Sequence, residues 1–162
     1  EEFKMKKKVM AVLTAAGMAG MLLSPFTAMA ADQNVSVSYT KANEYELSIP
    51  KTVTLSASDE TVMKIGATKM NIEPGKEVHV SVKKGINDGR VTLQRKNSKD
   101  LATSKVSMSS NGTLITSVQT VAIFSGRNTN ATTGGELYFS ALPATLAAGE
   151  WTGQIVFEVG VK

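Results

Sequence analysis

The stretch Glu77-Val78-His79-Val80-Ser81-Val82-Lys83 alternates strictly between valine and polar side chains. Successive side chains of a β-strand point to opposite faces, so this period of two predicts a strand with one face in a core and the other in water. Residues 35–39 and 45–49 show the same alternation, with Ser or Glu between the apolar positions. Helical spacing is confined to the first 30 residues. The sequence therefore predicts an all-β domain.

Runs of this kind are separated by residues typical of turns. They predict strands near 34–40, 44–55, 61–72, 76–83, 90–95, 104–109, 113–124, 136–140 and 150–161, with turns at Pro74-Gly75, Asn87-Asp88-Gly89, Asn111-Gly112 and Gly134-Gly135. Asn111-Gly112 predicts a tight type I′ hairpin because both residues tolerate positive φ. Residues 126–134 are predicted to form a polar loop. About seven to nine antiparallel strands predict an immunoglobulin-like antiparallel β-sandwich, with a barrel as the alternative.

The first 30 residues have the order of a secretory signal peptide. Residues 5–8 are Met-Lys-Lys-Lys, residues 9–23 are apolar, and Ala28-Met29-Ala30 is a small-x-small cleavage site. We therefore expect residues 5–30 to be removed and residues 31–162 to form one secreted or cell-surface domain. It would meet a membrane only through the signal peptide before cleavage. Residues 1–4 are expected to be a non-native or mis-assigned start.

Charge and cysteine content restrict the class of protein. The chain has 18 Lys and Arg and 14 Asp and Glu, but four of these lysines and two of these glutamates lie in the first eight residues. The mature domain would keep 14 basic and 12 acidic side chains, which argues against a nucleic-acid-binding protein. The absence of cysteine excludes a disulfide framework and a zinc–thiolate site. A secreted chain without disulfides suggests a Gram-positive bacterium or an anaerobe.

No catalytic or metal-binding set is recognisable in the sequence. The single histidine, His79, falls on the polar side of its predicted strand, so it is expected in solvent without a nucleophile to activate. The adjacent acidic residues Asp59-Glu60 and Glu44/Glu46 are expected at a loop and on an exposed face, although a glycosidase-like carboxylate pair stays open. The sequence therefore predicts a protein that is not an enzyme, with no cofactor and no metal.

Aromatic residues indicate where a sugar could bind, because sugar rings stack on exposed aromatic side chains. Trp151 shares its parity with Ile155 and Phe157, so it is expected to pack in the core. Tyr138 has the opposite parity from its neighbours and is expected to point outward. Arg127, Asn128 and Tyr138 are therefore the candidates for a ligand-binding loop site.

Two further surface sets follow from the pattern. If residues 76–83 and 90–95 form a hairpin, a basic patch would gather Lys83, Lys84, Arg90, Arg95 and Lys96 on one face. Near the mature N-terminus, Val35, Val37 and Tyr39 alternate with serine. These three residues are what a donor strand would need to complete the sheet of a neighbouring molecule, and also what an ordinary first strand needs.

Two stretches resemble small secreted immunoglobulin-like proteins of Firmicutes. Residues 45–55 (YELSIPKTVTL) resemble their Tyr-x-Val-x-Ile-Pro-x-x-Ile-x-Leu opening strands, and residues 146–159 (LAAGEWTGQIVFEV) resemble their closing strands. The closing pattern is also similar to that of fimbrial and spore-coat-type pilus subunits. The resemblance implies an immunoglobulin-like sandwich and a surface location more than an activity. Chaperone–usher pilins have paired cysteines and lack a final strand, whereas this chain has no cysteine and its last strand is predicted to be complete.

These observations favour a secreted or cell-surface, non-enzymatic interaction or adhesion module. Its partner would be a cell-surface protein or glycan, or the protein itself, and not a nucleic acid. The first alternative is a structural subunit of a pilus-like surface filament, assembled by N-terminal strand donation. The second is a carbohydrate-binding module. A protease inhibitor that presents residues 126–134 is a further alternative.

Overall fold

The computed structural model describes residues 36–162. The predicted signal peptide (5–30), the predicted start at 1–4 and Val35 lie outside the described residues. Residues 43–162 form one compact unit, and the residues before Asn43 belong to a separate one. Each unit is described by itself.

All regular structure in the described residues is β-strand. The longer strands are β1 (Glu44–Ser48), β2 (Thr61–Asn71), β3 (Glu77–Lys84), β5 (Arg90–Arg95), β6 (Leu101–Ser107), β7 (Thr120–Ser125), β9 (Thr132–Phe139) and β11 (Val156–Val161). The short strands are β4 (Ile86–Asn87), β8 (Arg127–Asn128) and β10 (Trp151–Thr152). The all-β prediction is confirmed.

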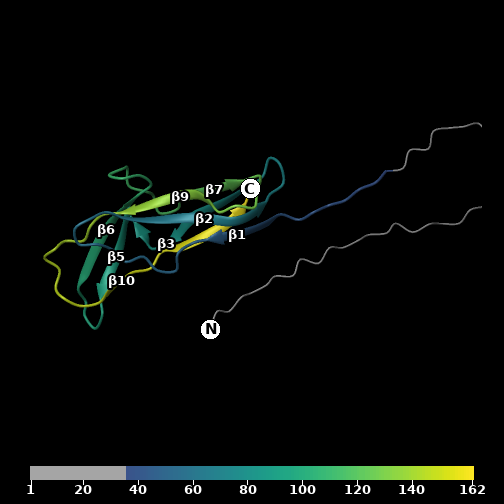
Figure 1. The fold of residues 1–162 in the computed structure, drawn as a ribbon. Helices are drawn as coiled ribbons and strands as arrows, with labels where there is room; N and C mark the ends of the chain where they lie inside the picture. The colour runs from purple at the N-terminus through teal and green to yellow at the C-terminus, as the bar shows by residue number, and fades with distance from the viewer. Residues whose placement is uncertain (1–35) are drawn as a thin grey trace, which may run out of the picture. The chain divides into compact units, whose positions relative to one another are not determined.

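The strands form two antiparallel sheets (Figure 1). The larger sheet has the order β1-β2-β9-β6-β5-β10, with β4 paired to β5 and β8 paired to β2. The smaller sheet has the order β11-β3-β7, and β7 packs against β9 and β2 of the larger sheet. The predicted antiparallel β-sandwich is therefore confirmed, with a core between the two sheets.

The alternation in β3 sets one wall of this core. Val78, Val80 and Val82 are buried, while His79 and Ser81 between them face outward and are only partly covered. On the larger sheet, Ile65 of β2 is fully buried in the same core. Full burial of an aliphatic side chain contributes about 1.5–3 kcal/mol, so the valine row alone accounts for a sizeable part of the domain's stability.

The two sheets approach closely at a pair of glycines that the sequence pattern assigned to a turn. Gly134 and Gly135 lie inside β9, and a Cβ on Gly135 would meet backbone atoms of Val121 and Ala122 in β7. A Cβ on Gly134 would meet the ring of Phe124. The predicted turn here is wrong, because glycine serves for close backbone approach at this point. The loop predicted over 126–134 is confirmed only for residues 126 and 129–131, since residues 127–128 form β8 and residues 132–134 belong to β9.

The tight hairpin turn lies elsewhere than predicted. Asp88 and Gly89 have φ values of 46° and 70° and join the paired residues Asn87 and Arg90, which is the pattern of a type I′ turn. At the predicted position, only Asn111 has a positive φ (50°), and it joins no ladder of paired strands. The type I′ prediction for Asn111-Gly112 is therefore wrong, whereas the predicted turn at Asn87-Asp88-Gly89 is confirmed.

Four predicted strands are shorter than the sequence pattern suggested. Residues 36–40 contain no strand, β1 stops at Ser48, β7 begins only at Thr120, and the closing strand is split into β10 and β11. Pro50 explains the end of β1, because proline lacks the N–H that a central ladder requires. Gly153 explains the split, since its Cα lies so close to the carbonyl oxygen of Thr92 that a Cβ would be 2.5 Å from it.

Candidate functional site

The free edge of β11 is the first candidate binding surface. Among the described residues β11 pairs only with β3, so its other edge carries no partner strand. Val159 and Val161 lie opposite Val80 and Val78, which places all four on the core side of the smaller sheet. The two residues of β3 are fully buried, yet Val159 and Val161 are 37% and 40% exposed. The core side of the smaller sheet is therefore partly exposed to solvent along β11.

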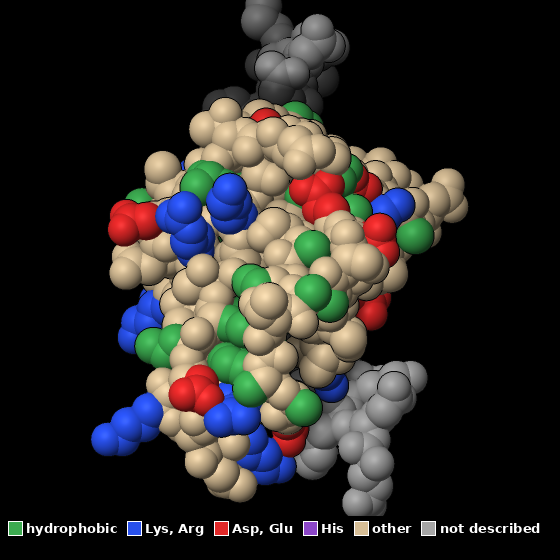
Figure 2. All heavy atoms as spheres, turned by 90° about the vertical axis from the view of Figure 1, so that its left-hand side faces the viewer, with side chains coloured by type: hydrophobic (Ala, Val, Ile, Leu, Met, Phe, Trp, Pro, Cys, Tyr) green, Lys and Arg blue, Asp and Glu red, His purple; other side chains and the backbone are tan. Residues whose placement is uncertain are grey.

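A cleft of about 350 Å³ opens where β11 begins. Its apolar lining includes Trp151, Ile155 and Phe157. Most residues of the segment 50–55 line it as well; this segment has a strand-like sequence pattern, but the described structure shows no backbone–backbone hydrogen bond to it. Figure 2 faces the end of the domain that carries β5, β6 and β10, and it shows hydrophobic side chains gathered near the middle of that face.

Both interruptions of the predicted strands border this cleft. Residues 50–55 were expected to continue β1, and residues 153–155 were expected to join β10 to β11. The predictions found strand-forming sequence in both places, but the structure leaves it outside the ladders. A cleft flanked by such segments is a place where an extended chain can lie, and sequence reasoning missed it.

The predicted donor segment is only partly within the described residues. Val35 lies outside them, while Val37 and Tyr39 are 91% and 79% exposed and belong to no strand. The alternation predicted a strand here, and the described part has none. The side chains of Val37 and Tyr39 are thus exposed, and a partner could cover them.

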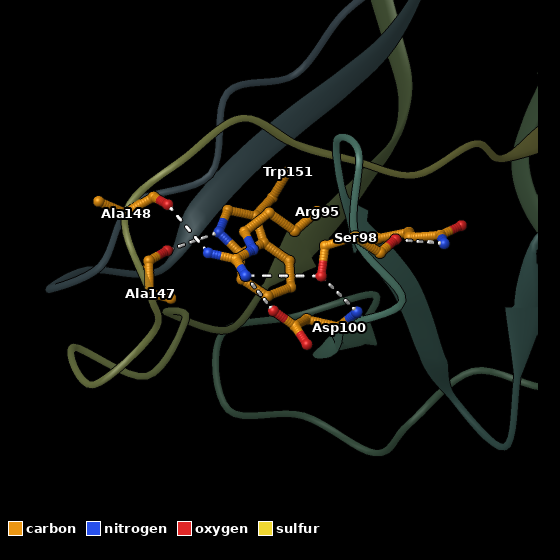
Figure 3. A network of polar contacts seen from close by, with 7 residues as sticks. Arg95, Ser98, Asp100, Ala147, Ala148 and Trp151 are labelled. Atoms are coloured by element: carbon orange, nitrogen blue, oxygen red, sulfur yellow. Dashed lines mark hydrogen bonds and ion pairs between the residues drawn. The ribbon is translucent and has the colours of Figure 1, made fainter.

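Trp151 and Arg95 form a structural cluster beside the cleft (Figure 3). They are direct partners in the pairing of β10 with β5. The indole Nε1–H of Trp151 donates to the carbonyl oxygen of Ala147 at 3.1 Å, and the Arg95 guanidinium donates to the carbonyl oxygen of Ala148 at 3.4 Å and forms an ion pair with Asp100. Trp151 is partly buried against the core, as predicted. These contacts attach residues 147–151 to the β5–β6 hairpin.

The predicted basic patch is not assembled. Its condition, a hairpin between residues 76–83 and 90–95, is wrong, because β3 belongs to the smaller sheet and β5 to the larger. Three of the five cations have carboxylate partners: Lys83 with Glu158 at 3.2 Å, Lys96 with Glu150 at 2.9 Å, and Arg95 with Asp100. Lys84 and Arg90 make no ion pair within the described residues.

The predicted ligand-binding loop is divided between two ends of β2. Arg127 and Asn128 form β8, which pairs with Asn71 and Met70 at one end of β2. Tyr138 lies in β9 opposite Val62, at the other end. At about 3.3 Å per residue, eight residues of strand separate the two places by roughly 26 Å. The three residues therefore do not form one site, and the long-range pairing that separates them left no local signal.

Tyr138 is instead held by an acidic neighbour. Its hydroxyl donates to Glu136 Oε2 at 2.6 Å, and Lys64 lies 3.6 Å from the same carboxylate. The hydrogen bond from Tyr138, followed by the charge of Lys64, lowers the pKa of Glu136. The same hydrogen bond raises the pKa of Tyr138. The outward direction predicted for Tyr138 is confirmed, but its ring is partly buried.

His79 is more covered than the sequence suggested. Its side chain is 17% exposed, and Nε2 lies 2.9 Å from Glu77 Oε2. Nδ1 is buried and has no hydrogen-bond partner among the described residues. The position on the outer face is as predicted, whereas the expected full exposure is wrong.

Two searches of residues 36–162 gave negative results. No group of three or more His, Cys, Asp and Glu side chains in that range is placed to hold a metal ion. In the same range no helix has the length and apolar character needed to cross a membrane. Comparison with protein-family models, with curated protein sequences and with solved structures gave no significant match.

Proposed function

We propose that the chain is a non-enzymatic interaction module, secreted or held at the cell surface, that adds a partner's extended strand to the free edge of β11. One observation supports this proposal most directly: Val159 and Val161 face the core side of the sandwich but are left partly uncovered at an unpaired edge. Exposed edges of this kind bind extended peptides, with main-chain hydrogen bonds for affinity and alternate side chains for specificity.

The expected affinity is modest. About 40% of each valine side chain would be newly covered, and full burial contributes about 1.5–3 kcal/mol, so the two valines add about 1–2 kcal/mol together. Each main-chain hydrogen bond adds about 0.5–1.5 kcal/mol, against about 1–2 kcal/mol for ordering each residue of the incoming strand. Because these gains are close to the entropy cost of ordering the incoming strand, we expect weak, reversible association unless the partner also fills the cleft at the start of β11.

We further propose that the partner strand is residues 35–39 of a second copy. Val35, Val37 and Tyr39 repeat with the same period as Phe157, Val159 and Val161, and the described members are in solvent. Each copy then offers one donor and one acceptor. Such a head-to-tail contact generates open filaments unless its rotation closes a ring, as expected for a subunit of a pilus-like structure. A strand of a cell-surface protein is the other partner that this edge suits.

The test is a complementation experiment on the purified chain. The donor-deficient variant is V37S/Y39S, and the acceptor-deficient variant is V159K, which places a charge at the uncovered edge. The control is L101S, because Leu101 is 64% exposed at the start of β6 in the larger sheet and is not part of the β11 edge. Light scattering against concentration and electron microscopy should show association of the wild type and of L101S, and of neither deficient variant alone.

Mixing the two deficient variants should restore heterodimers, since one keeps a working acceptor and the other a working donor. Wild-type chain that stays monomeric at all concentrations would contradict self-association. If the wild type is a monomer and V37S/Y39S lowers its melting temperature, the segment pairs with its own domain instead. Association that persists in both deficient variants would place the interface elsewhere.

A further inference from the structure

A second hollow lies on the outer face of the larger sheet, away from β11. It has a volume of about 290 Å³ and lies over β5, β6 and β9. The side chains used in the argument are Glu60, Arg90, Lys105, Asn111 and Tyr138. None of them is part of the strand edge of the proposed function, so this hollow is argued independently of it.

One wall of the hollow is the loop that follows β6, and it is fixed by specific contacts. Gly89 lies against Leu114 so closely that a Cβ would be 3.1 Å from the Leu114 Cδ1 and Cγ atoms and nearer still to its Cβ. The Ser107 hydroxyl donates to the carbonyl oxygen of Ser109 at 2.7 Å. The backbone N–H of Asn111 donates to Glu60 Oε1 at 3.2 Å. The hollow is therefore preformed.

Two cations line the hollow in an unfavourable arrangement. Arg90 and Lys105 are direct partners across β5 and β6, and both point away from the core because Val91 and Val106 beside them are buried. Like charges in directly opposite positions of a sheet are destabilising. Within the described residues, neither makes an ion pair; the only side-chain hydrogen bond of Arg90 goes to the carbonyl oxygen of Asp88 at 3.2 Å.

Two outward lysines of the same sheet have carboxylate partners. Lys64 and Lys69 of β2 lie 3.6 Å and 4.0 Å from the carboxylates of Glu136 and Glu44. Arg90 and Lys105 have no such ion-pair partner among the described residues, although the Glu60 carboxylate lines the same hollow. An anion placed between the two side chains would remove their repulsion, and a planar carboxylate matches the donor geometry of the guanidinium.

The remaining lining groups suit hydroxyls and a ring. Glu60 is positioned by the Asn111 N–H and can accept hydrogen bonds through its other oxygen, and the Asn111 side chain offers a carbonyl oxygen. Tyr138 contributes an aromatic wall that the hydrogen bond to Glu136 holds in place. Donors with a carboxylate preference thus lie beside acceptors and an aromatic ring.

We propose that this hollow binds a sugar acid. Its carboxylate lies between Arg90 and Lys105, its hydroxyls donate to Glu60 and Asn111, and its ring lies against Tyr138. The volume suits one monosaccharide unit, at the lower end of the range for small-molecule sites.

The test is a titration of the full chain at low ionic strength with three probes: D-glucuronate, D-glucose and acetate. Amide shifts in two-dimensional NMR should respond to glucuronate at residues 105–114 and 138–140. R90Q and K105Q should each weaken glucuronate binding at least about tenfold, which is a typical loss for a charge-assisted contact. The control variant K69Q removes one positive charge from the same sheet face and should leave the dissociation constant unchanged.

R90Q and K105Q both replace side chains that point away from the core, so both variants should stay folded. Relief of the like-charge contact predicts that K105Q melts no lower than the wild type. The proposal is overturned if glucose or acetate binds as tightly as glucuronate, if K69Q weakens binding as much as R90Q does, or if the shifted amides lie outside the hollow. An absence of any shift up to saturating glucuronate would overturn it equally.

Discussion

Alanine at position 135 would place a methyl carbon inside the backbone of the opposing sheet. The new Cβ would lie 2.9 Å from the carbonyl carbon of Val121 and 3.0 Å from Cα of Ala122, and nearer still to the carbonyl oxygen of Val121. Carbon atoms in favourable contact are about 3.5–4.0 Å apart. The two sheets would therefore have to separate locally by about 0.5 Å or more.

The cost should be near the upper end of the range for overpacked cores. A flexible side chain could rotate away, as Phe124 could at Gly134, but the atoms met by residue 135 are backbone. Overpacking costs about 1–3 kcal/mol and occasionally more, so we expect about 3 kcal/mol for G135A. That value lowers the ratio of folded to unfolded chains roughly 150-fold, since about 1.4 kcal/mol corresponds to a factor of ten.

The assay is urea unfolding followed by the fluorescence of Trp151, the single tryptophan. The matched control is G160A in β11, where an added Cβ meets nothing within 4 Å. Because glycine within a strand is about 0.5–1 kcal/mol less favourable than alanine, G160A should be neutral or slightly stabilising. A G135A midpoint within about 0.5 kcal/mol of the wild type, at an unchanged slope, would refute the close approach of β7 and β9.

Four further substitutions test other parts of the structure. W151A should cost about 2–3 kcal/mol in urea unfolding followed by far-ultraviolet circular dichroism, below the value for a fully buried ring, because Trp151 is only partly covered. Y138F removes the hydrogen bond that lowers the pKa of Glu136. The wild type should therefore be more stable than this variant above about pH 4.5, and the difference should decline as the pH falls through the lowered pKa. Melting curves between about pH 3 and 6 would show this decline. G89A and G126A both place alanine at φ 70°, but only the Cβ at position 89 meets a neighbouring side chain. G89A should therefore lower the free energy of unfolding by at least about 1 kcal/mol more than G126A does. Equal losses of stability in the two variants would contradict the packed wall of the hollow.

The local sequence pattern was sufficient to predict the strands whose two faces differ most in polarity. The alternation in residues 76–83 predicted β3 and its buried valines, and the boundaries predicted for residues 90–95 agree with β5. The period of two depends only on the geometry of a single strand, so it can be read without knowing the partner strand. The outward direction of Tyr138 and the packing of Trp151 follow from the same parity.

Pairing and close approach were decided by the tertiary structure. Nothing local distinguishes Gly134-Gly135 as a contact between sheets from Gly134-Gly135 as a turn, because glycine serves both purposes. Likewise, residues 50–55 and 153–155 have strand-like sequence, but whether they find partners depends on segments far away in the chain.

The candidate sites show the same division. The sequence by itself predicted that Tyr138 faces outward, and it shows the alternation of residues 35–39. Only the tertiary structure put β3 and β5 in different sheets, separated Tyr138 from Arg127, and placed Lys105 directly opposite Arg90. The physical reason is that side-chain direction is a property of one strand, whereas a site is formed by strands whose order results from burial of the whole core.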